Sequence, residues 1–151
     1  MRKFAIFLTA AAMLFALTGC FSAIDYTLPQ NPTEFDTETF VNPDDSEDTY
    51  ASFEFNGRTY IPYGTPKNGI SGNDIGQCLG YIVQDGEKLT DERVFTLRDD
   101  TENNFLAVLT YEGFMDPPLF YRAVDTAGKE TAIPRIVDSL GYDFWNEGKM
   151  K

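Results

Sequence analysis

Short apolar runs, several with strict alternation, dominate the chain from residue 51 onwards. Two alternating runs, residues 52–55 and 58–61, flank Asn56-Gly57, the dipeptide that most favours a type I′ β-hairpin. Four further apolar runs of strand length follow, at residues 78–83, 94–97, 105–111 and 119–124. Their lengths and the turn-forming segments between them are typical of an antiparallel sheet. The pattern predicts a small, mainly β domain over residues 51–151, either a barrel or a sandwich.

One segment near the carboxyl end has helical signals instead. Residues 133–141 carry Pro134 at the start and Gly141 at the end, which places proline in a first helical turn and glycine just after the last. We therefore expect one short C-terminal helix. The aromatic residues that follow it, Tyr142, Phe144 and Trp145, are predicted to form a lid on the sheet.

The first twenty residues have the pattern of an export signal. Arg2 and Lys3 precede an apolar run over residues 4–17, as in a secretory signal peptide. This run is shorter than the roughly 20 residues that cross a bilayer as a helix, so a permanent transmembrane span is the weaker interpretation. One alternative is an ordinary secreted protein in which Cys20 and Cys78 are joined in a disulfide.

The end of this signal, Leu17-Thr18-Gly19-Cys20, resembles the lipobox of bacterial lipoproteins. The resemblance implies that residues 1–19 are removed and that a diacylglyceryl group is joined to the sulfur of Cys20. It places the protein on the outer face of a bacterial membrane, held by its lipid. Two or more acyl chains on one residue give stable anchoring, whereas one chain is marginal.

Residues 20–50 are predicted to form an acidic, flexible tether after the lipidated cysteine. Residues 21–50 contain eight acidic residues, three prolines and no Lys or Arg. Such a composition keeps a chain solvated and extended. Four aromatic residues in the segment, Phe21, Tyr26, Phe35 and Phe40, indicate that part of it packs on the domain or on a partner.

Charge and composition exclude several function classes. The chain has 24 acidic and 12 basic residues, for a formal net charge of -12, which makes nucleic acid a poor partner. It has no histidine, which removes imidazole bases, His metal ligands and Ser-His or Cys-His nucleophile pairs. We expect no cofactor, and Cys78, within an apolar strand, is predicted to be a buried and inert thiol.

A turn between two predicted strands is a weak candidate for a cation site. Asp99, Thr101 and Asn103 alternate like the first ligands of a calcium loop. The sixth and twelfth positions are Asn104 and Thr110, where that loop requires glycine and a bidentate glutamate. The sequence therefore favours a solvated hairpin turn without a metal.

A second candidate chemistry is a carboxylate pair. Asp138, Asp143 and Glu147 could supply the two acids of a glycan hydrolase, although the spacing of such a pair in space cannot be read from sequence. Acidic residues are also frequent enough in this chain to cluster by chance.

Aromatic residues and one arginine are the candidates for ligand binding. Tyr and Trp are enriched where binding energy concentrates, so we predict a partner-binding edge formed by Tyr63, Tyr142, Phe144 and Trp145. Arg122, within a predicted strand, can bind a ligand carboxylate or pair with one of the protein's own acids.

The order of the hairpin and the later apolar strands, with residues 74–82, 94–97, 104–108 and 120–122, is similar to that of uncharacterised surface lipoproteins of Gram-positive bacteria. That resemblance implies no activity. We expect a non-enzymatic binding module at the cell surface, for a protein, peptide or glycan. Two alternatives stay open: an immunity or inhibitor lipoprotein that captures a toxin or enzyme, and a carboxylate-dependent glycan hydrolase.

Overall fold

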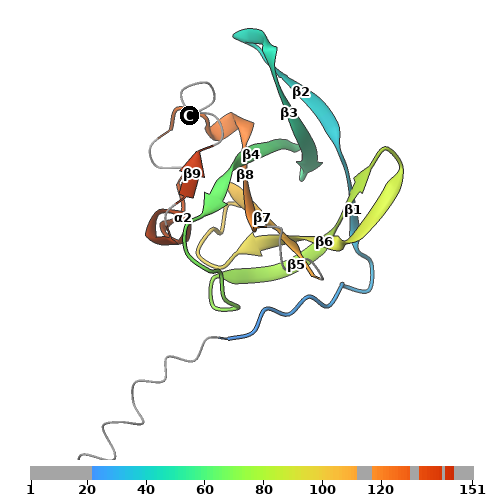
Figure 1. The fold of residues 1–151 in the computed structure, drawn as a ribbon, viewed down its shortest axis with the longest axis vertical. Coiled ribbons are helices and arrows are strands. Elements are labelled where there is room, and N and C mark those ends of the chain that lie inside the picture. Colours follow the sequence, from blue (N-terminus) through green and yellow to red (C-terminus); the bar gives the residue numbers. More distant parts are fainter. Residues whose placement is uncertain (1–21, 112–116, 130–132, 141, 145–151) are drawn as a thin grey trace, which may run out of the picture.

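A computed structural model of the chain describes residues 22–111, 117–129, 133–140 and 142–144. Strands account for most of the regular structure in these residues, with two short helical turns near the carboxyl end (Figure 1). The elements in chain order are β1 (Thr33–Asp36), β2 (Glu38–Asn42), β3 (Asp45–Phe55), β4 (Arg58–Pro66), β5 (Ile75–Gln84), β6 (Glu87–Leu97), β7 (Phe105–Thr110), β8 (Leu119–Ala123), the 3-10 helix η2 (Val124–Thr126), α2 (Arg135–Leu140) and β9 (Tyr142–Phe144).

The strands form one curled sheet in the order β1-β5-β6-β7-β8-β4-β3-β2, and β9 adds to β4. Neighbouring strands are antiparallel except β1 and β5, which are parallel. The sheet bends into a half-barrel (Figure 1), so that β1 and β3 come into contact although they lie far apart in the strand order. The predicted fold, mainly β with one short C-terminal helix, is confirmed.

Both faces of the sheet are buried at its central strands. Along β7 every residue from Phe105 to Leu109 is buried, and alternate side chains belong to two separate apolar clusters. The inner cluster fills the concave side of the half-barrel and draws on every strand from β1 to β8 except β2. Its buried members are Phe35, Phe53, Tyr60, Ile82, Val94, Leu106, Val108, Tyr121 and Ala123.

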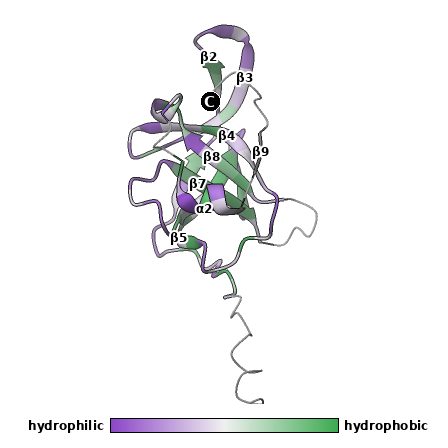
Figure 2. Ribbon diagram, turned by 90° about the vertical axis from the view of Figure 1, so that its left-hand side faces the viewer, coloured by the Kyte–Doolittle hydropathy of each residue, from purple (hydrophilic) through white to green (hydrophobic). Residues whose placement is uncertain are grey.

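The outer cluster lies on the opposite face of the same strands. It is covered by α2, by the loop before β5 and by the chain that precedes β1, through the partly buried Ile24, Tyr26, Leu28, Ile70, Ile133 and Ile136. Figure 2 shows the apolar residues concentrated in the central strands and the hydrophilic ones in the turns and along β3. The buried members of the outer cluster are Tyr63, Ile75, Cys78, Phe95, Leu97, Phe105, Ala107, Leu109, Phe120 and Val137.

Two hairpin turns form at the dipeptides that the sequence offers. Asn56 and Gly57, between β3 and β4, have φ angles of 52° and 73°. Asp85 and Gly86, between β5 and β6, have φ angles of 52° and 80°. Positive φ at both central residues defines a type I′ turn, whose twist matches that of the flanking strands. The predicted hairpin at Asn56-Gly57 is confirmed.

The carboxyl end forms one short helix and one short edge strand. The helix α2 comes directly after Pro134, as expected, while Gly141 lies outside the described residues. Tyr142 and Phe144 belong to β9, whose backbone pairs with β4 from Gly64 to Pro66. Their backbone extends the edge of the sheet, because β4 pairs with β3 only as far as Tyr60. The predicted aromatic lid stays a prediction. Trp145 lies outside the described residues.

The segment predicted as a flexible tether is largely part of the sheet. β1, β2 and the first half of β3 lie before residue 51, and the Phe35 side chain is 1% exposed within the inner cluster. The backbones of β1 and β5 lie close together because residue 80 is a glycine. A Cβ atom on Gly80 would lie 1.8 Å from the carbonyl oxygen of Thr33. The acidic residues and prolines of this segment therefore led to the prediction of a linker. The segment forms the strand β1 instead, because Phe35 is buried and Gly80 on β5 allows the two backbones to approach closely.

Residues 1–21, with the predicted signal and Cys20, lie outside the described residues. Among the residues that the structure does describe, no helix is long and apolar enough to cross a membrane.

Candidate functional site

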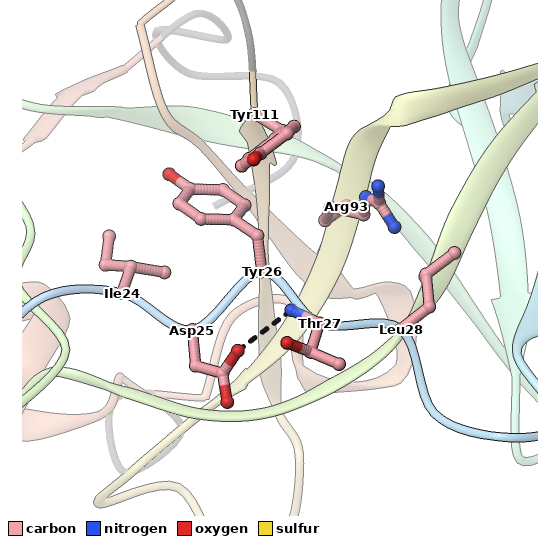
Figure 3. Close-up of a pocket in the computed structure, with 7 residues that line it drawn as sticks. All are labelled: Ile24, Asp25, Tyr26, Thr27, Leu28, Arg93 and Tyr111. Carbon is pink, nitrogen blue, oxygen red and sulfur yellow. Dashed lines mark hydrogen bonds between the residues drawn. The ribbon is translucent and has the colours of Figure 1, made fainter.

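A surface pocket of about 460 Å³ lies on the outer face of the sheet. We name it the Arg93 pocket. Its floor comes from β6 and the end of β7, and its wall is the chain that precedes β1 (Figure 3). The described residues that line it are Ile24, Asp25, Tyr26, Thr27, Leu28, Arg93 and Tyr111.

Aromatic packing fixes the wall of the Arg93 pocket against the sheet. The Tyr26 ring meets the ring of Phe95 edge-on, with centroids 5.6 Å apart and planes at 90°. It also contacts the ring of Tyr111 at 5.3 Å and 51°. Arg93 precedes Phe95 by two residues in β6, so strand alternation places both side chains on the outer face. The pocket therefore forms because the chain before β1 is anchored by Tyr26 in the outer cluster.

The guanidinium of Arg93 is the unusual group in this pocket. Its Nε and Nη1 atoms are buried and have no hydrogen-bond partner among the described residues. Its Cζ atom lies 5.9 Å from the centroid of the Tyr111 ring, within cation–π range. Leaving a charged donor buried without an acceptor costs free energy, and such groups are rare in folded proteins. An arginine in this state is suited to receive an anion.

The other charged residue of the pocket lining is Asp25. It is exposed, and its Oδ1 atom accepts a hydrogen bond from the backbone N–H of Thr27 at 2.9 Å (Figure 3). Hydrogen bonds from the side chain and backbone of Thr27 lower the pKa of this carboxyl group. The pocket thus presents one cation, one ionised carboxylate and two tyrosine rings, of which Tyr111 is 56% exposed.

A second candidate surface is the outer part of the β2–β3 hairpin, residues 38–51, which we name the acidic arm. It projects beyond the half-barrel (Figure 1), and β2 is the last strand of the sheet. It contains no Lys or Arg. Its five acidic residues are Glu38, Asp44, Asp45, Glu47 and Asp48.

Polar contacts hold the tip of the acidic arm in shape. The Asn42 side chain, 3% exposed, donates from Nδ2 to Asp48 Oδ2 at 2.9 Å, and its Oδ1 accepts from the backbone N–H of Asp44 at 3.0 Å. The Tyr50 hydroxyl donates to the same Asp48 carboxylate. Desolvation and this bond to Asp48 raise the pKa of Tyr50 to about 12. The arm is therefore a defined hairpin whose carboxylates are held outside the core.

A groove of about 330 Å³ lies at the base of the acidic arm, between β1–β2 and β3–β4. Four carboxylates line it: Glu34, Asp36, Glu38 and Glu54. Glu34 is held there by Lys88, whose Nζ lies 2.5 Å from Oε1, and by the Tyr81 hydroxyl at 2.8 Å. The bonds from Lys88 and then Tyr81 lower the pKa of Glu34. The negative surface of the arm thus continues into the sheet.

Two residues predicted for ligand binding are core residues in the structure. The Tyr63 side chain is 3% exposed and packs edge-on against Phe105 in the outer cluster, with ring centroids 4.8 Å apart. Arg122 is 5% exposed, and its Nε donates to Thr126 Oγ1 at 2.9 Å. Its guanidinium lies 5.5 Å from the Tyr63 ring centroid. The ligand-binding role predicted for Tyr63, and the ligand-carboxylate alternative for Arg122, are contradicted because β4 and β8 are adjacent and turn these side chains into the covered outer face.

The remaining predicted residues are only partly described. Tyr142, Phe144 and Asp143 form the backbone of β9, and Asp138 is exposed on α2. The predicted carboxylate pair with Glu147 stays a prediction, because Glu147 lies outside the described residues.

The turn with Asp99, Thr101 and Asn103 joins β6 to β7, as the sequence favours. Its buried acid is Asp100, whose Oδ2 accepts the backbone N–H of Phe105 at 2.7 Å, and burial raises the pKa of this carboxyl group. The Asn103 carbonyl accepts from the Tyr60 hydroxyl at 2.5 Å. No group of three or more His, Cys, Asp or Glu residues suited to a metal occurs in the described part of the chain.

Cys78 has the environment predicted for an inert thiol. It is 8% exposed in the outer cluster, and desolvation raises the pKa of the thiol. A raised pKa reduces the thiolate fraction at neutral pH, so the group is a poor nucleophile.

Sequence reasoning missed the Arg93 pocket, because its lining comes from segments more than sixty residues apart, around Tyr26 and Arg93. The one signal available in the sequence was Arg93, which lies two residues before the apolar Phe95 and therefore on the same face of a strand. Comparisons with protein-family models, with curated proteins and with solved structures return no match. The functional argument therefore depends on the pocket and the acidic arm themselves.

Proposed function

We propose that this protein is a membrane-anchored, extracytoplasmic and non-enzymatic binding module that captures a basic protein or peptide through its acidic arm. The observation that carries the proposal is the arm itself: a projecting edge hairpin with five carboxylates and no Lys or Arg. Complementary charge steers a partner of opposite sign and raises the association rate.

The start of the described chain and the arm lie at opposite ends of the protein. Residue 22 lies two positions after Cys20, and the chain from residue 22 runs along the end of the half-barrel away from the arm (Figures 1 and 2). If the lipobox-like sequence is processed and Cys20 is acylated, the arm points away from the bilayer. A partner arriving from outside the cell then reaches the arm first.

The edge position of β2 supplies a mode of contact. Among the described strands β2 pairs only with β3, so its other side presents backbone N–H and C=O groups that an extended peptide can pair with. Val41, 48% exposed on this strand, adds an apolar contact. An immunity or inhibitor lipoprotein, which neutralises a basic toxin or enzyme at its own membrane, is one form of this function that the same surface favours.

The test compares two triple variants of the full chain that remove the same charge. The arm variant carries Glu38→Gln, Asp44→Asn and Glu47→Gln. The control carries Glu87→Gln, Asp91→Asn and Asp99→Asn, which are exposed on β6 and the turn after it. Each detergent-solubilised protein is immobilised and exposed to extracts of the producing organism's envelope and to its culture medium.

We expect a basic protein that wild type and control retain, that the arm variant loses, and whose association rate falls at least tenfold from low to high salt. Equal retention by all three proteins, or a partner that dissociates with no dependence on salt, would overturn the proposal. Retention of no protein at all would also overturn it and would shift attention to glycans and to the acids around Asp138.

A further inference from the structure

We propose that the Arg93 pocket is a second binding site, for a sugar that carries a carboxylate. The site is independent of the proposed partner at the acidic arm, because it lies on a different face and has the opposite charge at its centre. Its ligand chemistry is set by three features: an arginine whose Nε and Nη1 atoms have no acceptor among the described residues, a pair of tyrosine rings, and an ionised aspartate at the rim.

The guanidinium of Arg93 favours an anionic ligand. Within the described residues, the Nε and Nη1 atoms of Arg93 find no acceptor, although the side chain lines an open pocket. A carboxylate in the pocket would give the guanidinium charge-assisted hydrogen bonds, which are roughly twice as strong as neutral ones. The planar fork of arginine matches the two oxygens of a carboxylate. Such a ligand would supply the acceptors that Nε and Nη1 lack among the described residues.

The charge of the pocket favours a carboxylate over a phosphate. Arg93 is the single cation among the described lining residues, and Asp25 contributes an ionised carboxylate to the same lining. A ligand group with one negative charge is balanced by Arg93 alone. A phosphate with nearly two negative charges would leave one of them facing Asp25, with no second cation in the described lining.

The two tyrosines of the pocket favour a ligand that contains a sugar ring. Tyr26 and Tyr111 lie with their ring centroids 5.3 Å apart, and Tyr111 is more than half exposed. Aromatic faces of this kind pack against the apolar face of a pyranose, while Asp25 and the Thr27 hydroxyl offer acceptors for sugar hydroxyl groups. The volume of about 460 Å³ admits a small ligand of this type.

The pocket also lies close to the predicted anchor. Ile24 lies four positions after Cys20, a span of at most about 14 Å of extended chain. With Cys20 acylated, the ligand would be bound close to the membrane surface, at the end opposite to the acidic arm.

The test measures binding of radiolabelled glucuronate to the full-length protein by equilibrium dialysis, with glucose as the neutral counterpart. We expect glucuronate to bind at least tenfold more tightly than glucose. Arg93→Gln should lower the affinity for glucuronate at least tenfold, and Arg93→Lys should restore part of the loss. Tyr111→Ala, at an exposed position, should weaken binding of glucuronate several-fold with no loss of the fold.

The matched control is Arg135→Gln, which removes the same charge from an exposed position on α2 and should leave binding unchanged. Thermal unfolding of each variant shows that the pocket is still formed. If glucuronate binds no better than glucose, or binds equally to wild type and Arg93→Gln, the proposal is wrong. If N-acetylphenylalanine displaces glucuronate and binds more tightly, the site recognises a peptide carboxyl terminus and the sugar assignment falls. Neither result affects the partner at the acidic arm.

Discussion

The acidic arm and β7 belong to one sheet, yet they are opposite in almost every respect. In β7 the five residues from Phe105 to Leu109 are buried and apolar, with one cluster on each face. Between residues 38 and 49 of the arm only Asn42 is buried, and it is polar. The strand β7 lies in the middle of the strand order, whereas β2 lies at its end.

The difference shows two ways in which this chain makes strands. Those in the centre form because apolar side chains on both faces leave water. The arm forms through backbone pairing, the contact of the Phe40 and Tyr50 rings at 6.5 Å, and the hydrogen bonds around Asn42. Stability should therefore reside in the half-barrel, while the charged side chains of the arm contribute little to it.

The largest expected effect on the free energy of unfolding comes from removing the aromatic ring of Phe53, at the base of the arm. Phe53 is 1% exposed and contacts the rings of Phe35, Tyr60 and Tyr121. Phe53→Ala leaves a cavity in the inner cluster and should lower the free energy of unfolding by about 3–5 kcal/mol. In the arm, Val41→Ala should change it by less than about 0.5 kcal/mol.

Urea unfolding of the two variants, followed by circular dichroism, measures both values. A loss for Val41→Ala similar to that for Phe53→Ala would show that the arm contributes to the stability of the core, contrary to the comparison. A small loss for Phe53→Ala would mean that the inner cluster is not packed as described.

An intermediate loss in the free energy of unfolding is expected for a substitution at the contact between β1 and β5. A Cβ atom on Gly80 would lie 1.8 Å from the Thr33 carbonyl oxygen, in backbone that cannot move without separating β1 from β5. Gly80→Ala should destabilise the fold by about 1–3 kcal/mol, the usual cost of overpacking. Gly69→Ala is the matched control, because no atom lies within 4 Å of its added Cβ.

Hydrogen exchange of the β1 amides distinguishes a local from a global effect. Faster exchange in β1 of Gly80→Ala, with exchange in β7 little changed, would place the damage at the β1–β5 contact. Equal unfolding free energies for the Gly80 and Gly69 variants would contradict the close approach.

The strands of the half-barrel could be predicted from sequence because their information is local. Asn56-Gly57 specifies its turn with two adjacent residues, and β5 to β8 appear as apolar runs bounded by turn residues. Burial on both faces of β7 explains why its run is continuous and shows no alternation.

What could not be predicted depends on contacts distant in the chain. Phe35 is one apolar residue among acids, and its burial depends on Phe53 and on the close approach at Gly80. Tyr63 was expected at the surface because tyrosine is common in binding sites, whereas its burial is a consequence of the strand order. The Arg93 pocket needs Tyr26 beside β6, which no local pattern indicates.

The smallest expected effect is a pH-dependent change in the melting temperature when Glu34, at the contact between β1 and β5, is substituted. Glu34 in β1 accepts bonds from Lys88 and Tyr81, which lower the pKa of its carboxyl group below the ordinary value of 4.5. A carboxylate with a lowered pKa in the folded state stabilises the fold above its unfolded pKa, and this contribution is lost as the pH falls through the folded pKa. Glu34→Gln should therefore lower the melting temperature slightly at neutral pH. The difference from wild type should shrink as the pH falls below 4.5.

Glu87→Gln is the control for this last measurement, since Glu87 is exposed and its side chain has no hydrogen bond among the described residues. Its effect on the melting temperature should be small across the acid range. Because both Glu34 and Lys88 are largely solvated, added salt should also reduce the Glu34 effect. A Glu34→Gln difference that grows on acidification would mean that the carboxylate opposes the attachment of β1. The acidic segment would then be held to the half-barrel by Phe35 and the Gly80 contact alone.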